Sequence, residues 1–418
     1  MPSSIPPLWP SDTPADDPPV VAGDTELEPR PPGADGSAAG SVAPLRRRLA
    51  EAARPLAGPL VIYAASRLVT ALAIGLAAFA ARKPVHKVIT TWDGRWYEKI
   101  VLHGYPHSVP HGDFYEGTGR QVQSAVAFFP LYPMIVRVFD AVLPGGAALA
   151  GVVVSLLLGA VATVIVWLLA QHVAGREVAD RAAVLFVFSP GAFVLSLLYA
   201  EALMIVLCGA CLLALMHRRW ALAGVLGALA TATRPNASAV VVACAWAAGV
   251  ALWRHRDWRA LLAPAIAPVG MVGFFAFLWW HTDEPLIWFR VEADGWGERF
   301  DFGQRNASIA LAFARAPLSH PNRLVLGLSL ILTVVAVVLV FRARLGGVLN
   351  AYTGTALFLV LGSHINARPR FLFVAFPIVI ALAKYARRSA FTVLAACFAS
   401  STVLLTVFYG LHRGNYYP

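Results

Sequence analysis

Charged side chains are scarce in this sequence of 418 residues. Asp, Glu, Lys and Arg together make up 14% of it, whereas 58% is hydrophobic. Soluble globular chains carry roughly a quarter charged residues, so this chain lacks the polar surface to face water on all sides. Residues 148–170 run without one charge over about the length that a bilayer core requires. The composition excludes a soluble domain and predicts an all-α polytopic membrane protein.

Cysteine is also rare, and its placement excludes a disulfide scaffold. The four cysteines, Cys208, Cys211, Cys244 and Cys397, all lie inside apolar runs. Cys208 and Cys211 form a C-x-x-C pair, but within a predicted membrane helix rather than in the strand–helix context of a redox motif. We therefore interpret them as small packing residues.

The sequence shows no convincing metal site and indicates no cofactor. His103, His107 and His111 are spaced by four residues, which on a helix would suggest metal ligands. Pro106 and Pro110 interrupt that helix, so the three imidazoles would not share a face.

Acidic residues are outnumbered, and the formal net charge is +11. The basic residues form short clusters between apolar runs, which predicts topology signals and no nucleic-acid partner. Residues 1–44 are rich in Pro, Gly, Ala, Ser and Asp, and we expect a disordered cytoplasmic tail before the membrane domain 45–418. Arg46–Arg48 precede the first apolar run, which should act as an uncleaved signal anchor.

We expect about eleven transmembrane helices, joined so that one set of connections is basic. The predicted spans are 58–81, 148–171, 182–198, 200–216, 220–233, 237–253, 260–280, 324–342, 347–363, 370–385 and 390–410. With the tail cytoplasmic, the inner connections are 172–181, 217–219, 254–259, 342–344 and 384–388. Every one of them carries basic residues, as the positive-inside rule requires.

The remaining polar features then fall on the outer face. They are the long first loop 82–147, the turns 198–201 and 233–236, the loop 281–323 and the turn 363–370. Pro190 and Pro235 leave the adjoining helices short, and broken spans are tolerated at membrane depth where they line a cavity. The sequence therefore predicts a polar cavity that opens outward.

Asp93 lies in the first outer loop among Trp92, Trp96 and Tyr97, which are typical of the membrane–water interface. A carboxylate at this depth costs free energy unless it has a task or a cationic partner. Two interpretations remain open: Asp93 either caps the short helix that continues through Gly94, or takes part in catalysis.

The same loop continues into 128–139, which is aromatic at its start and then amphipathic. It predicts a helix lying on the membrane surface, with Arg137 turned to the headgroups. A further span is the alternative, but residues 140–146 leave it short and the charge topology would invert.

Glu201 is the one ionisable residue in a stretch of more than 35 residues, at the outer end of a span. An isolated acid inside a membrane segment is a candidate functional residue. It can equally be a Glu that the helix dipole favours at a helix N-terminus, and the two interpretations are compatible.

Three arginines come near the same outer level: Arg234, Arg368 and Arg370. Arginine suits bidentate phosphate binding, whereas a simple anchor can use a lysine that reaches the headgroups. The alternative for Arg368 is a side chain that extends to the lipid headgroups. This alternative is weaker for Arg234, because that residue precedes the helix-breaking Pro235.

Taken in order, these segments resemble the PIG-V family, the mannosyltransferases that add the second mannose of GPI anchors, and their bacterial homologues. The motifs are W-D-G-x-W-Y, F-F-P-L-Y-P, F-S-P-G-A-F…Y-x-E-A-L, T-R-P-N and R-P-R-F…A-F-P, and they cover about residues 58–418. The resemblance implies the GT-C membrane glycosyltransferase fold and a polyprenyl-phosphate-mannose donor. The acid of the family's first outer loop matches Asp93. Eukaryotic members often show W-D-x-x-H-F there, a departure that leaves the acceptor open.

The resemblance implies mannosyl transfer to a glycolipid, glycan or protein acceptor at the extracytoplasmic face of a bacterial plasma membrane, by a metal-independent inverting mechanism. A polyprenyl phosphate leaves readily as an anion, so one base suffices where glycosidases need two carboxyl groups. Asp93 would be the general base, and Arg234, Arg370 and Arg368 would bind the donor phosphate. The further substrate-binding residues would be Glu201, Trp92, Trp96, Tyr97, Asn236 and His364.

Two other classes of protein share some of these features. A transporter or lipid flippase predicts internal repeats and ionisable residues at the bilayer midplane, whereas here no repeat is found and the acids and arginines fall at one face. A non-catalytic assembly subunit would have no reason to gather an acid and arginines at one level.

Overall fold

The protein folds into helices joined by turns and short irregular segments. The computed structural model describes residues 54–111, 122–364 and 367–411, and the predicted tail lies outside them. In the described ranges the one β-contact is an isolated antiparallel bridge between Phe300 and Ser363. The all-α prediction is confirmed.

Six helical stretches of the described chain are long and apolar enough to cross a membrane. They are Ala57–Ala81 (α2), Gly146–Ala174 (α6), Pro235–His255 (η5 and α10), Trp258–Thr282 (η6, α11 and α12), Pro321–Ala343 (α15) and Arg388–Leu411 (α19). Shorter apolar helices are Glu201–Met216 (α8), Trp220–Thr231 (α9) and Gly347–Gly362 (α16). A polytopic membrane protein is confirmed, while the count of eleven spans stays a prediction.

Two predicted spans are broken rather than continuous. The run 182–198 forms the end of α7 (Arg176–Val187) and the short helix η4 (Ala192–Ser196), and 370–385 forms α17 (Pro369–Phe373) and α18 (Pro377–Tyr385). A proline lies at each break, Pro190 at the first and Pro377 at the second. The helix is interrupted there because proline cannot donate the backbone hydrogen bond that a continuing helix needs.

Arg67 of α2 satisfies the irregular backbone at the first break. It is buried, and its guanidinium donates hydrogen bonds to the carbonyl oxygens of Val187 (3.0 Å) and Ala192 (2.8 Å) and to the hydroxyl of Ser196 (3.0 Å). A carbonyl without a hydrogen bond costs about several kcal/mol inside a bilayer, so each must find a donor within the protein. Arg67 thus allows a non-helical segment inside the bundle.

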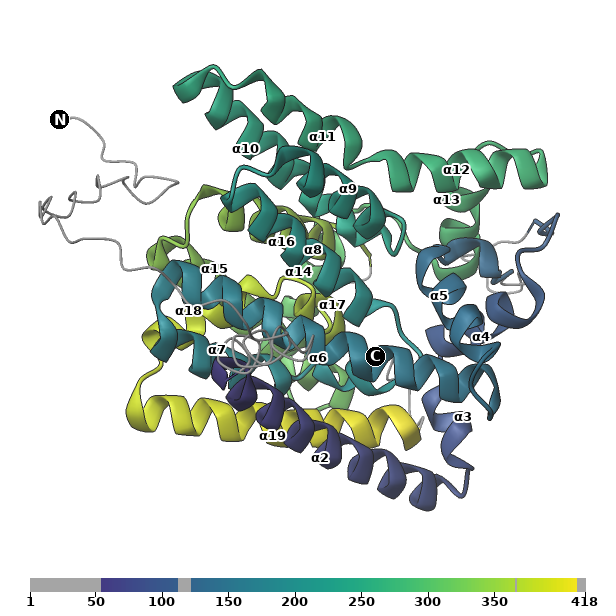
Figure 1. Ribbon diagram of the computed structural model, residues 1–418. Helices are drawn as coiled ribbons and strands as arrows, with labels where there is room; N and C mark the ends of the chain where they lie inside the picture. The colour runs from purple at the N-terminus through teal and green to yellow at the C-terminus, as the bar shows by residue number, and fades with distance from the viewer. Residues whose placement is uncertain (1–53, 112–121, 365–366, 412–418) are drawn as a thin grey trace, which may run out of the picture.

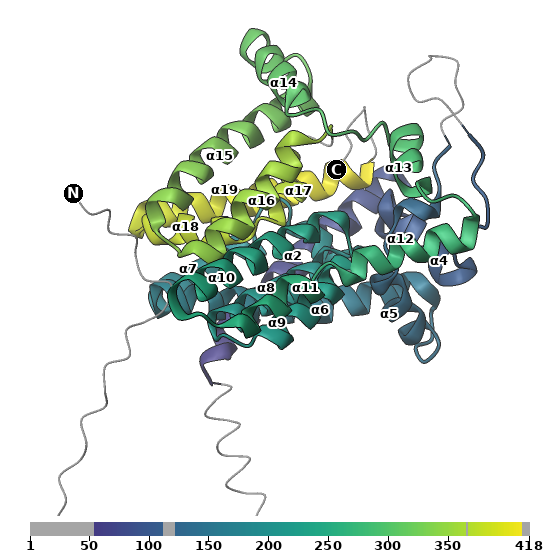
Figure 2. The same cartoon turned by 90° about the horizontal axis from the view of Figure 1, so that it is seen from above.

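The helices are arranged so that α6 packs against several neighbours, while α2 and α19 lie side by side along one edge (Figure 1). Small residues permit this close packing: a Cβ on Gly159 of α6 would lie 2.4 Å from the hydroxyl of Tyr63. Turned by 90°, α15 and α14 (Gln304–Arg315) stand at the rim of the bundle beside α16 (Figure 2). Helix packing by small residues is typical of membrane bundles.

The basic connections come together at one end of the bundle. The contacts that join them are His172–His217 (ring centroids 5.4 Å apart), Arg218–His255 (3.1 Å), Arg181 to the carbonyl of Ala383 (3.0 Å) and Lys384 to the carbonyl of Ala343 (2.7 Å). The opposite end carries α4 (Asp93–His103), α5 (Leu131–Asp140) and α13 (Ile287–Val291) (Figure 2). The two sets of connections predicted from charge therefore lie at two different ends, and α5 is the helix expected at 128–139.

The positive-inside rule predicts that the basic end faces the cytoplasm. In a variant with the exposed Cys397 replaced by serine, we expect a cysteine at Arg256 to resist a membrane-impermeant maleimide added to intact cells. A cysteine at Phe302, which is 82% exposed at the other end, should react. External labelling at position 256 with protection at position 302 would reverse the orientation.

Candidate active site

Asp93 is the first residue of α4 and follows a backbone of unusual conformation. Trp92 has φ 56° and ψ −119°, a combination that is strained for a bulky residue. The preceding carbonyl of Thr91 accepts hydrogen bonds from the hydroxyls of Tyr409 (2.7 Å) and Tyr199 (3.3 Å). The helix cap is Trp92, so the structure does not support the capping interpretation of Asp93.

Gly94 lets this turn approach the bundle closely. A Cβ at this position would lie 3.0 Å from the carbonyl oxygen of Ile89 and 3.6 Å from the Cβ of Leu198. The glycine of the W-D-G sequence therefore has a packing role, because a side chain would push Asp93 away from the segment that leads to Glu201.

Asp93 meets three other charged side chains, which together we call the ion cluster: Asp93, Glu201, Arg234 and Arg370. Arg370 Nη2 lies 3.0 Å from Asp93 Oδ2, and Arg234 Nη1 lies 3.6 Å from the same oxygen. Glu201 Oε1 accepts a hydrogen bond from Arg234 Nη1 at 2.9 Å and lies 3.5 Å from Arg370 Nε. Each acid therefore faces both arginines.

Four segments far apart in the sequence supply these side chains. Glu201 begins α8 directly after the broken segment, and Arg234 is the extended residue before Pro235. Arg370 lies in α17, which comes so close to Gly191 that a Cβ there would lie 2.5 Å from the carbonyl oxygen of Pro369. Helix breaks therefore place three of the four charges, as the sequence suggested for Pro190 and Pro235, and Asp93 is placed by the start of α4.

Exposure is graded across the ion cluster. The exposed fraction of the side chain is 1% for Glu201, 5% for Arg370, 11% for Arg234 and 17% for Asp93. Buried charges persist only when they are paired, and two acids with two arginines give a formally neutral set. Asp93 is the carboxylate that a bound substrate can reach most easily.

The pairing leaves some hydrogen-bonding capacity unused. Among the described residues, Glu201 Oε2 and Arg370 Nη1 are buried without a hydrogen-bond partner in the protein. Arg370 also lies over the ring of Tyr199, with 5.1 Å from its guanidinium carbon to the ring centroid. Buried polar atoms are nearly always satisfied in native proteins, so such exceptions at one place indicate a ligand site.

The aromatic residues expected near Asp93 pack within the protein. Trp96 stacks on Phe128 with centroids 6.1 Å apart and meets the edge of Trp296 at 5.8 Å. Tyr97 is fully buried and contacts the rings of Phe128 and Tyr132. Their observed role is to support α4, whereas a contact of either with substrate stays a prediction.

Three further residues predicted for the site, Asn236, Arg368 and His364, lie near it in the chain. Asn236 is half-buried in η5 (Pro235–Ser238), two residues after Arg234, and Arg368 is the half-buried residue before α17. His364 Nδ1 lies 3.2 Å from Asp301 Oδ2, in the segment that leads toward α17. The structure brings Asp93, Glu201, Arg234 and Arg370 together, and it shows no ion pair from Arg368 or His364 to this cluster in the described chain.

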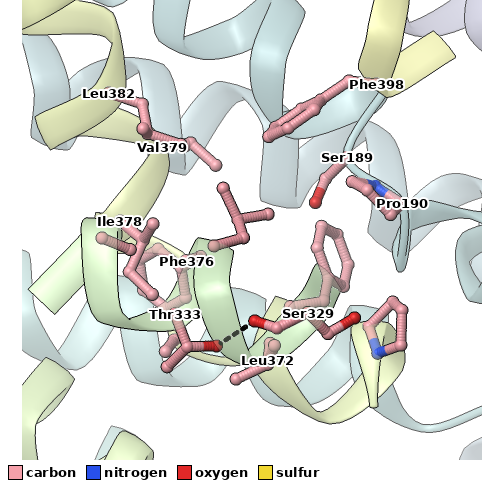
Figure 3. A pocket seen from close by; sticks show the side chains of 15 residues that line it. Ser189, Pro190, Ser329, Thr333, Leu372, Phe376, Ile378, Val379, Leu382 and Phe398 are labelled. Carbon is pink, nitrogen blue, oxygen red and sulfur yellow. Dashed lines mark hydrogen bonds between the residues drawn. The ribbon is translucent and has the colours of Figure 1, made fainter. Parts of the chain in front are cut away.

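An apolar slot lies beside α17, between α15, α18 and α19 (Figure 3). We define it by Pro190, Thr333, Pro369, Phe376, Val379 and Phe398. The hydrogen bond drawn in Figure 3 lies within α15, where the hydroxyl of Thr333 donates to the backbone carbonyl of Ser329 (2.7 Å). Pro369 lines the slot, and its neighbour Arg370 belongs to the ion cluster, so the slot and the cluster adjoin.

The buried pairs predict a large effect from neutralising Glu201. Glu201→Gln would leave Arg234 and Arg370 with one carboxylate between them, and we expect the free energy of unfolding to fall by about 3 kcal/mol. Glu177→Gln is the matched control, because its carboxylate is 84% exposed beside Arg181 and should contribute at most about 1 kcal/mol. Thermal unfolding of both purified variants in detergent measures this, and equal melting temperatures would contradict it.

Comparison with known proteins connects this site to a class of enzyme. Residues 125–364, more than half of the chain, match glycosyltransferase family 87. The matched range includes Glu201 and Arg234 and lies between Asp93 and Arg370. No match was found among curated proteins.

Solved structures give distant likenesses. The apo oligosaccharyltransferase of Archaeoglobus fulgidus aligns at 14% identity with a TM-score of 0.43, over 84% of this chain and 56% of that one. The same organism's AglB, in complex with an inhibitory peptide and a dolichol-phosphate, aligns at 14% identity with a TM-score of 0.37 over the same shares. The chain therefore spans a little over half the length of these structures, and scores this low support no argument about its activity.

The family match agrees with the kind of activity that the motifs imply and does not single out the PIG-V family or mannose. The part of the chain that the structure describes also contains six helical stretches long and apolar enough to span a membrane. The chain belongs to glycosyltransferase family 87.

Proposed function

We propose that this GT-C enzyme transfers mannose from a polyprenyl-phosphate-mannose donor to a lipid-linked or glycan acceptor, at the extracytoplasmic face of a bacterial plasma membrane. One observation carries the proposal: a partly exposed carboxylate, Asp93, lies beside two buried arginines, Arg234 and Arg370. The resemblance of the W-D-G-x-W-Y and R-P-R-F motifs to the PIG-V family supports mannose and the lipid phosphate.

The chemistry needs one base and a place for an anion. Asp93 accepts the proton of the acceptor hydroxyl, whose oxygen attacks the anomeric carbon of the sugar. The bond from that carbon to the phosphate oxygen breaks, and the electron pair leaves with the lipid phosphate. A single displacement of this kind inverts the anomeric configuration, and it requires no metal because arginines stabilise the departing charge.

The ion pairs of Asp93 fit this sequence of events. Arg370 and Arg234 both face Asp93 Oδ2 at 3.0 and 3.6 Å. A donor phosphate that binds these guanidiniums competes with Asp93 for them, which leaves the carboxylate free to accept a proton. Arg370 Nη1 has no protein partner among the described residues and can donate to a phosphate oxygen without breaking any existing bond.

Glu201 would hold the arginines in place while the phosphate binds. It is the most buried member of the ion cluster and lies beside both guanidiniums, on the side that faces away from solvent. Its carboxylate keeps Arg234 and Arg370 charged and oriented, so we assign it a positioning role in addition to any contact with sugar hydroxyls.

The apolar slot offers a place for the first isoprene units of the donor lipid. It lies between helices of the membrane bundle and adjoins Arg370 through Pro369. A lipid that places its phosphate at Arg370 would then bury apolar chain against Phe376, Val379 and Phe398.

The base assignment predicts a specific loss of catalysis. Asp93→Asn keeps the size of the side chain but cannot accept a proton, so we expect the rate of sugar transfer to fall about 10²–10⁴-fold. Glu98→Gln, which removes a carboxylate from the same helix, should retain the parental rate. The assay uses membranes supplied with polyprenyl-phosphate-mannose, and normal turnover by a well-expressed Asn variant would show that Asp93 is not the base.

The slot assignment predicts an effect that depends on the donor lipid. Ala336→Phe narrows the slot, and we expect it to raise KM about tenfold for a polyprenyl donor, the cost of leaving about two methylene-sized groups unburied. A donor with a methyl group in place of the polyprenyl chain should keep its KM, which also shows that the variant is folded. Val335→Phe, on the exposed side of α15, should change neither value. A chain-length effect in Val335→Phe alone would place the lipid on the other face of α15.

A further inference from the structure

Two buried tyrosines from distant segments meet at the backbone that leads to Asp93. Tyr199 opens the Y-x-E-A-L motif, two residues before Glu201, and Tyr409 lies near the end of α19. Both side chains are buried. Their hydroxyl oxygens lie 3.0 Å apart, and each lies within hydrogen-bond distance of the carbonyl oxygen of Thr91. The pair therefore connects two parts of the bundle to the first outer loop.

The two hydroxyls act as a chain, because each has a single hydrogen to donate. The hydroxyl of Tyr409 lies 2.7 Å from the carbonyl oxygen of Thr91, whereas that of Tyr199 lies 3.3 Å from it. The arrangement that fits these distances has Tyr409 donating to Thr91 and Tyr199 donating to the oxygen of Tyr409. Hydrogen bonds linked in this way strengthen one another, so Tyr199 reinforces the bond made by Tyr409.

The carbonyl of Thr91 belongs to the turn that places Asp93. It also accepts a hydrogen bond from the backbone N–H of Gly94 (3.2 Å), which closes the turn around Trp92 and Asp93. Trp92 has φ 56°, a conformation that a bulky residue keeps only where its surroundings hold it. Without the hydroxyl of Tyr409 the carbonyl would lose its shortest hydrogen bond, and Trp92 could relax. Asp93, the next residue, would move with it.

Tyr409 is a rigid support because the end of α19 is closely packed. Its ring meets that of Phe193 with centroids 5.5 Å apart. A Cβ on the following Gly410 would lie 2.5 Å from the Cβ of Ala77 and 3.1 Å from Val88 Cγ1. These contacts fix the end of α19 against α2, beside which it runs (Figure 1), and against α3 (Val85–Ile89). The hydroxyl of Tyr409 thus has a defined position from which to hold the turn.

Tyr199 connects the same turn to the arginines of the ion cluster. The guanidinium carbon of Arg370 lies 5.1 Å from the centroid of its ring, a distance at which a cation is attracted to an aromatic face. Arg370 Nη2 in turn lies 3.0 Å from Asp93 Oδ2. One side chain therefore contacts Arg370 with its ring and the support of the Asp93 turn with its hydroxyl.

We propose that Tyr409 and Tyr199 are positioning residues, which hold the base Asp93 in place through the backbone turn before it. The inference rests on the proposed role of Asp93 as general base and adds two residues to that site. Both tyrosines are buried and bond to protein groups, so they act through the turn and not on the substrate. A base must lie within hydrogen-bond reach of the proton that it accepts, and small displacements are costly.

Tyr409→Phe tests this assignment in membranes supplied with polyprenyl-phosphate-mannose. The substitution removes one oxygen and keeps the ring that packs on Phe193. We expect kcat to fall about tenfold as the base loses its placement. The KM for the donor should stay at the parental value, because the arginines that bind the phosphate are unchanged. Tyr199→Phe should lower kcat less, because Tyr409 keeps its own bond to Thr91.

Tyr63→Phe is the matched control. The hydroxyl of Tyr63, on α2, donates to the carbonyl of Leu156 of α6 at 2.7 Å, and the side chain is buried. Each of the two variants loses one buried bond from a tyrosine to a carbonyl, so we expect similar falls in Tm in detergent. Tyr63→Phe should nevertheless keep the parental kcat.

A double-mutant cycle with Asp93→Asn shows whether Tyr409 acts through the base. Two residues that act as a unit give effects that do not add. In the Asp93→Asn background no base remains to be placed, so Tyr409→Phe should cause no further loss of the residual rate.

The outcomes separate this inference from the proposed function. A parental kcat in Tyr409→Phe, an equal loss in Tyr63→Phe, or the full loss repeated in the Asp93→Asn background would overturn the positioning role while the base assignment stands. A raised donor KM with an unchanged kcat would also overturn it, because the tyrosines would then serve donor binding. If the parent transfers no sugar from this donor, or if Asp93→Asn keeps full turnover, the proposed function and this inference are both wrong.

Discussion

The mutual neutralisation of two acids and two arginines is the interaction on which the architecture of this site depends. A charge that leaves water for the interior of a membrane protein is strongly unfavourable unless an opposite charge accompanies it. Glu201 is almost fully buried, so it requires Arg234 and Arg370 beside it. Asp93 completes the balance at the more exposed side.

That requirement explains why irregular backbone gathers at this level of the bundle. Three of the four charges lie at or next to helix breaks: Glu201 after η4, Arg234 before Pro235, and Arg370 in the short helix α17. Such backbone needs its own hydrogen-bond partners inside a membrane. Arg67 supplies them for the first break, and Gly191 allows α17 to pack directly against it. The chemistry at the site and the structural support beneath it are therefore linked.

The outer loop supports the helix that begins with Asp93. Its turn η7 (Glu292–Trp296) contacts α4 directly, because the ring of Trp296 meets that of Trp96 although 200 residues separate them in the chain. Gln123 links the same two elements, since it donates to the carbonyl of Gly295 and accepts from Arg95. The position of Asp93 therefore depends on a segment from the second half of the sequence.

The sequence by itself determined the membrane class, the division of the connections into a basic and a non-basic end, and the four ionisable residues that form the cluster. These follow from local properties: hydrophobic run length, the cost of exporting basic loops, and the cost of an isolated charge in an apolar stretch. Only the tertiary structure decided that each acid faces both arginines, that Trp96 and Tyr97 pack within the protein beside α4, and that Arg67 satisfies the backbone of the first helix break. Those features depend on contacts between segments that lie from about thirty to more than a hundred residues apart in the chain, and no local pattern encodes which buried group will lie opposite which.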